Sequence, residues 1–201
     1  MDLFARLGKR LCYISITLMR TAIRLPQAFV EVLNYPHVET FVLHDDGTFP
    51  NSRLPLVIYR SAMKLSGPDS TKTFKALFAQ HDWGNNWSAN VYDFHHYHST
   101  SHEVLGVSAG EASLQFGGEN GVGERIAAGD VIIIPAGVAH KNNGCTQDFT
   151  VVGGYPEGRD WDLNKGLPGE RPKADENIAK LPLPKLDPVY GCVGPLLENW
   201  N

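Results

Sequence analysis

Four residues from two segments of the chain have the types and spacing to bind one metal ion. His96, His98 and Glu103 lie in the first segment, and His140 lies in the second. Three imidazoles and one carboxylate suit a borderline divalent transition metal, which we expect to be iron, manganese, nickel or zinc, one ion per chain. His96 and His98 are two residues apart, so both would point to the same face of an extended strand. The spacing therefore predicts a metal site built from separate strands.

The two segments resemble the paired motifs of the cupin superfamily. The first motif, His-x-His, then Glu and Gly at set distances, fits residues 96–110 without a gap. The second motif fits in register at Gly129, Pro135, Gly137 and His140. Its last position, usually Asn, falls on Gly144, and the Gly expected before the first His falls on Asn90. Neither departure removes a ligand.

A narrower resemblance concerns four strings of sequence, HHYHSTSHEVLGV, LQFGGENG, GDVIIIPAGVAHK and VVGGYP. They look like a bacterial single-domain cupin group of uncharacterised function. The resemblance implies an all-β double-stranded β-helix, the jelly-roll barrel of cupins. It also implies that His96, His98, Glu103 and His140 are the metal ligands.

The carboxylate ligand has one competitor. His102 directly precedes Glu103, and a tighter turn would bring His102 to the metal in its place. The motif match favours Glu103, which also makes it a candidate catalytic residue. His102 would then be a hydrogen-bond partner of a ligand or a catalytic proton shuttle near the pocket mouth.

The walls of the pocket follow from strand alternation. Tyr92 and Phe94 share the alternation of His96, and Leu105 shares that of Glu103, so we expect these three side chains to line a largely apolar substrate pocket. His95 should face away from the metal. Trp83 and Trp87 just precede the metal segment, and three roles stay open for them: a pocket mouth, an interface or the core.

Composition indicates one ordinary globular domain. The chain has 201 residues, 42% of them hydrophobic and 20% charged, with a net charge of −4, so nothing indicates nucleic-acid binding. The three cysteines are odd in number and widely spaced, as expected for reduced thiols in the cytoplasm.

The first thirty residues differ from the rest. They carry five cationic residues against one acidic residue, a net charge of +4, and their leucines recur with helical periodicity. Their apolar run is too short to span a membrane. An organelle transit peptide, a helix packed on the domain and a dispensable segment all remain open.

Short apolar runs after Pro36 predict strands over 38–43, 54–63, 88–99, 102–107, 112–116, 131–134 and 149–153, with a helix over 70–82. Strands with glycine-rich turns favour a sandwich or barrel, and the cupin resemblance selects the jelly roll. We expect an N-terminal helical extension over 1–36, a barrel over 37–156 and a proline-rich arm over 157–201. A short helix is indicated over 175–181. The arm should pack on the barrel or on a partner subunit.

Two function classes fit the predicted site. One is a metal-dependent enzyme acting on a small polar or aromatic metabolite, for which we favour a dioxygenase-like oxidoreductase, with a decarboxylase or isomerase as further options. The other is a non-catalytic cupin that binds a sugar acid or another carboxylate. Exposed sheet edges and an arm ending near Trp200 favour a homodimer.

Overall fold

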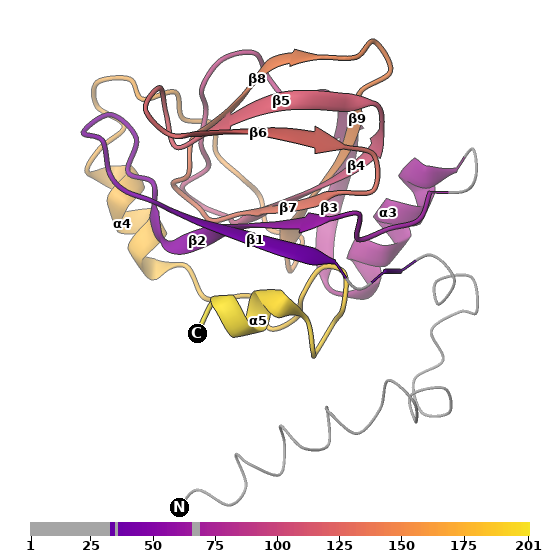
Figure 1. Ribbon diagram of the computed structural model, residues 1–201. Coiled ribbons are helices and arrows are strands. Elements are labelled where there is room, and N and C mark those ends of the chain that lie inside the picture. The colour runs from indigo at the N-terminus through magenta and orange to yellow at the C-terminus, as the bar shows by residue number, and fades with distance from the viewer. Residues whose placement is uncertain (1–32, 35, 66–68) are drawn as a thin grey trace, which may run out of the picture.

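The computed structural model describes residues 33–34, 36–65 and 69–201, in which nine strands form two antiparallel sheets (Figure 1). The larger sheet has six strands in the order β1-β2-β7-β4-β9-β3, and the smaller has three in the order β6-β5-β8. The strands are β1 His37–Leu43, β2 Ser52–Arg60, β3 Trp83–Ala89, β4 Glu103–Ala109, β5 Glu111–Phe116, β6 Val122–Ala127, β7 Val131–Ile134, β8 His140–Cys145 and β9 Thr150–Pro156. The two sheets enclose the apolar interior of a jelly-roll barrel, which confirms the predicted fold class.

Both faces of the central strands of the six-stranded sheet are buried. Inside the barrel, Ile132 and Ile134 of β7 pack with Leu114 and Phe116 from the smaller sheet. On the outer face, Ile133 packs in a second cluster that includes residues of helix α3 and the C-terminal arm. A strand buried on both sides has no polar face, which explains the three consecutive isoleucines of β7.

Helix α3 (Ser70–Gln80) covers part of this outer face through Phe74, Leu77 and Phe78. The helix was predicted over 70–82, and it ends two residues earlier. A Cβ atom added at Gly106 of β4 would lie 2.4 Å from the ring of Phe74. This glycine therefore lets the helix lie directly against the sheet.

Residues 157–201 run along the outside of the barrel and include helices α4 (Lys173–Lys180) and α5 (Pro195–Asn199) (Figure 1). Asp187 anchors this arm, since its fully buried carboxylate accepts hydrogen bonds from the Tyr59 hydroxyl at 2.6 Å and from the N–H of Val189, Tyr190 and Leu196. The indole N–H of Trp200 donates to the carbonyl of Pro55 at 2.8 Å. The arm thus supplies part of the cover that the outer face needs.

Several predicted strands require correction. The strand expected over 88–99 is wrong, because β3 ends at Ala89 and residues 90–102 form a loop with isolated bridges at His96 and Tyr97. Asn90 and Asp93 in this loop are poor strand formers. Strands β6 and β8 were not among the predicted elements.

The predicted N-terminal helix falls on residues outside the described part of the chain. Of the predicted extension over 1–36, Leu33, Asn34 and Pro36 are described, and Leu33 pairs with Met63. In the described ranges, no helix is both long enough and apolar enough to cross a membrane.

Candidate metal centre

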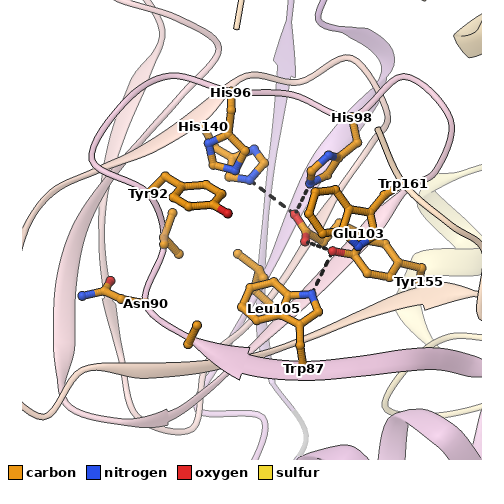
Figure 2. A pocket seen from close by; sticks show the side chains of 12 residues that line it. Trp87, Asn90, Tyr92, His96, His98, Glu103, Leu105, His140, Tyr155 and Trp161 are labelled. Carbon is orange, nitrogen blue, oxygen red and sulfur yellow. Dashed lines mark hydrogen bonds and ion pairs between the residues drawn. The ribbon is translucent and has the colours of Figure 1, made fainter. Parts of the chain in front are cut away.

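Three imidazoles and one carboxylate converge at the inner end of a cavity in the barrel (Figure 2). His96 and His98 come from the loop before β4, and His140 is the first residue of β8. One nitrogen from each of these three rings lies within 4.8 Å of the others. Oε2 of Glu103, the first residue of β4, is 3.5 Å from Nε2 of His98 and 3.3 Å from Nε2 of His140. All four side chains are buried.

Main-chain pairing brings His96 to His140 although no continuous strand joins them. The N–H of His96 donates to the carbonyl of His140 at 3.1 Å, and the N–H of His140 donates back at 2.9 Å. The carbonyl of His98 accepts from the N–H of Gly137 at 2.8 Å. These bonds give His96 and His98 the shared orientation that was predicted from a strand.

Each imidazole is oriented by a carbonyl of the main chain. Nδ1 of His96 lies 3.2 Å from the carbonyl of Phe94, Nδ1 of His140 lies 3.2 Å from that of Val138, and Nδ1 of His98 bonds the carbonyl of Asp162. A neutral ring that donates from Nδ1 carries its lone pair on Nε2. The three rings are thus held in the tautomer that binds a metal through Nε2.

Burial and mutual charge set the protonation of this group. Burial, with some contribution from His140, lowers the pKa of His96 to about 2, so this ring is neutral. Burial alone would raise the pKa of Glu103, but His98 and His140 lower it below its usual range, so Glu103 is a carboxylate. Burial opposes protonation of His98, yet the neighbouring Glu103 raises its pKa. The site is therefore a buried anion surrounded by imidazoles.

The carboxylate of Glu103 provides a test of whether the group fits a metal ion. Its Oε1 accepts a hydrogen bond from the hydroxyl of Tyr155 at 2.9 Å. Its buried Oε2 has no well-aligned hydrogen-bond donor among the described residues, although Nε2 of His98 and of His140 are near. An uncompensated buried carboxylate oxygen is costly, and a divalent cation between it and three imidazole lone pairs would remove that cost. The residues present fit a divalent transition metal.

The cavity leading to these ligands measures about 260 Å³ and has mostly apolar walls. Leu105 and Tyr92 line it as predicted, and Tyr92 is 47% exposed. Phe94 does not line it. Its ring stacks on Tyr92 at 4.8 Å, with Nζ of Lys165 4.5 Å from the Phe94 ring. Phe94 misses the cavity because the alternation of a strand does not hold in this loop.

His102 lies outside the cavity, unlike the position near the mouth expected for a proton shuttle. Its Nδ1 accepts a hydrogen bond from the N–H of Ala136 at 3.0 Å, and its ring packs 4.8 Å from that of Trp200. Burial, and to a smaller extent Arg159, lower its pKa to about 4. Glu103 is the first residue of β4 and faces the cavity, whereas His102, the last residue of the preceding loop, faces the arm.

Several cavity residues were not identified from the sequence as parts of the site. Tyr155 and Trp161 line the cavity beside Asn90 and Val91. The register that pairs Val104 with Gly154 places Tyr155 opposite Glu103. The string VVGGYP contains Tyr155, but its meaning depends on strand pairing, which the sequence pattern does not show.

Trp83 and Trp87, which precede the loop of residues 90–102, lie in different parts of the structure. Trp83 is buried in the outer core and donates to the carbonyl of Leu186 at 2.9 Å. Trp87 lines the cavity and donates from Nε1 to the hydroxyl of Tyr155 at 2.8 Å (Figure 2). A Cβ atom at Gly153 would lie 2.1 Å from the ring of Trp87, so glycine is needed for this ring to cross β9.

His95 lies beside the ligands in sequence but away from them in space. Its ring is 5.4 Å from that of Phe49, and its Nε2 is 3.2 Å from a carboxylate oxygen of Glu119. It is not among the residues that line the cavity.

No family model matches the chain. The chain is 43% identical over 163 residues to the uncharacterised protein YjlB of Bacillus subtilis. The aligned region covers 81% of this chain and 96% of YjlB.

Solved structures give weaker likenesses. A Klebsiella pneumoniae protein with a double-stranded β-helix domain is 18% identical, with a TM-score of 0.32, over 74% of this chain and 95% of that chain. Acireductone dioxygenase from Bacillus anthracis, with cadmium in its active centre, is 14% identical, with a TM-score of 0.33, over 62% of this chain and 79% of that chain. Neither likeness bears on the reaction of this chain. The identity to YjlB, together with the two motifs and the two-sheet barrel that carries them, shows that the chain belongs to the YjlB family of cupins.

Proposed function

We propose that this protein is a metal-dependent oxidoreductase of the dioxygenase type, acting on a small polar or aromatic metabolite. The observation that carries the proposal is the donor set of His96, His98, Glu103 and His140 at the inner end of an aromatic-walled cavity. A structural metal site has no need of a cavity leading to it. When bound, a redox-active ion such as iron would supply Lewis acidity and electron transfer.

The surrounding residues keep the ligands in place and limit water. Tyr155 donates to Oε1 of Glu103, which leaves Oε2 to face the imidazoles. Burial, and then the charge of Glu103, raise the pKa of Tyr155 well above its usual range, so its hydroxyl acts as a fixed donor and not as a base. A dry, preorganised setting strengthens electrostatic interactions with a bound substrate.

The walls suit a flat molecule with few charges. Trp87, Tyr92 and Trp161 offer ring faces and edges, while Leu105 and Val91 add aliphatic surface. Aromatic side chains contribute large contact areas and favour stacked or edge-on rings. A diol or hydroxy acid on such a framework would combine oxygen atoms for the metal with a ring for the walls.

The test begins with the metal content of the gently purified protein, expected to be about one ion per chain. The iron-loaded protein is then screened in an oxygen electrode against diols, hydroxy acids and flavonoid-like compounds. We expect oxygen uptake with at least one class, and loss of uptake in Glu103→Ala. His96→Ala should also lose oxygen uptake. His95→Ala is its matched control and should keep oxygen uptake, because the His95 ring faces away from the cavity. Tight binding of one compound with no oxygen uptake from any would replace the enzyme by a non-catalytic binding cupin.

A further inference from the structure

Asp162 lies in the segment after β9, and its carboxylate forms hydrogen bonds with the loop of residues 90–102 that carries His96 and His98. It accepts hydrogen bonds from the N–H of Ser99 at 2.6 Å, the N–H of Thr100 at 3.1 Å and the hydroxyl of Thr100 at 3.2 Å. The hydroxyl of Ser99 and the amide of Asn164 donate to its other oxygen. A carboxylate that accepts this many bonds holds the two residues after His98 in one conformation.

The main chain of Asp162 binds the same loop directly. Its carbonyl accepts the hydrogen bond from Nδ1 of His98, and its N–H donates to the hydroxyl of Thr100 at 3.0 Å. The ring nitrogen that does not face the metal site is thus bonded to the residue whose side chain fixes the adjacent loop. The direction of His98 depends on where Asp162 sits.

Trp161 directly precedes Asp162 in the chain and lies beside the candidate metal ligands. The Trp161 ring lies 4.9 Å from that of His98 and stacks at 27° on that of Tyr155, with 6.0 Å between centroids (Figure 2). Trp161 lines the cavity and remains 37% exposed. It therefore forms a wall that reaches from a metal ligand to solvent.

We propose that Asp162 is a positioning residue that fixes His98 as a metal ligand and seats Trp161 as the wall on which a flat substrate ring packs. This inference rests on the proposed metal-dependent function and adds the residue that links ligand geometry to substrate selection. The arm takes part as well, since Nδ2 of Asn177 in α4 donates to the hydroxyl of Ser99 at 2.9 Å.

The experiment separates the two roles of Asp162 with two probes on the full chain. Co²⁺ is titrated into metal-free protein, and its visible absorption spectrum reports the ligand arrangement. 4-Nitrocatechol, a flat chromogenic ring, is then titrated into the Co²⁺ protein. The variants are Asp162→Ala, Asp162→Asn and Trp161→Ala, with Asp160→Asn as matched control because that exposed carboxylate lies two residues away.

We expect Asp162→Ala to weaken Co²⁺ binding by about 10- to 100-fold and to alter the spectrum, as loss of a ligand-orienting partner does. Asp162→Asn keeps one acceptor oxygen and should recover part of the affinity. Trp161→Ala should keep the Co²⁺ affinity and weaken nitrocatechol binding by about 3- to 10-fold, the contribution of one aromatic pair. Asp160→Asn should match the wild type in both titrations.

A folded Asp162→Ala or Asp162→Asn protein that matches the wild type in Co²⁺ affinity and spectrum would overturn the positioning role. Wild type that binds no Co²⁺ would overturn it as well. Wild type that binds Co²⁺ but consumes no oxygen with any substrate would refute only the oxidoreductase, and the Co²⁺ titration of the variants would still decide the role of Asp162.

Discussion

Replacing Tyr155 by phenylalanine removes one oxygen atom from the inner end of the cavity and changes little else. That oxygen donates to Oε1 of Glu103 at 2.9 Å and accepts from Nε1 of Trp87 at 2.8 Å. The substitution therefore leaves a buried carboxylate oxygen without its donor and an indole N–H without its acceptor. The ring itself is preserved, so no cavity larger than one oxygen atom is created.

The magnitude follows from these two bonds. A hydrogen bond to a charged group contributes about 1.5–3 kcal/mol, and a buried group left without a partner costs about 1–3 kcal/mol. Because the two figures overlap for the same contact, we expect the free energy of unfolding to fall by about 2–4 kcal/mol in metal-free protein. Loss of the partner that orients a ligand should also weaken metal binding by about 10- to 100-fold.

The chain offers a matched control in Tyr59→Phe. The hydroxyl of Tyr59 also donates to a buried carboxylate, Oδ2 of Asp187 at 2.6 Å, on the outer side of the sheet. Asp187 keeps its three main-chain donors, so this variant should lose stability and keep its metal affinity.

The assays are denaturant unfolding of the metal-free proteins and Zn²⁺ titration against a chelator of known affinity. The expected pattern is a stability loss in both variants and an affinity loss in Tyr155→Phe alone. Equal Zn²⁺ affinities for the two variants would show that Tyr155 does not orient Glu103 as a ligand.

Four further outcomes can be measured. His140→Ala should lose most of its bound metal by elemental analysis, and full retention would disprove the four-ligand set. Burial would raise the pKa of Asp162, but hydrogen bonds from Ser99, Asn164 and Thr100 hold it below the ordinary 3.8. The ionised Asp162 therefore contributes its full stabilisation of the folded protein above pH 3.8, and this contribution is lost as the pH falls through the lower pKa of the folded state. The unfolding free-energy difference between wild type and Asp162→Asn should accordingly be constant near neutral pH and shrink in acid. Both metal motifs lie well after residue 33, and Leu33 pairs with Met63, so a deletion of residues 1–32 should leave the metal content and the thermal unfolding transition unchanged. Light scattering should give the mass of a homodimer, since β1 and β3 are open sheet edges, and a single-chain mass would contradict this.

The sequence predicted features that depend on local pattern. The run of isoleucines in β7 was placed at its observed bounds, and motif spacing selected the residues that converge in the cavity. Leu105 was placed correctly because β4 is a regular strand, so alternation holds there. Phe94 was misplaced because the same rule was applied to a loop.

Features that depend on distant pairing were not predictable in this way. Tyr155 meets Glu103 only because β9 pairs with β4 in one register. Trp161 and Asp162 lie in a proline-rich region without periodicity, and their contacts join residues more than sixty positions apart in the chain. No local rule connects such residues, and a single sequence carries no record of the contact.

The carbonyl groups that orient His96 and His140 bear on which sequence changes the site can tolerate. A carbonyl belongs to the backbone, so it survives replacement of the side chain at Phe94 or Val138. The side chains at these two positions can therefore vary while the rings of His96 and His140 keep their directions. The orientation of these two rings is therefore a property of the backbone fold and does not depend on the side chains that flank them.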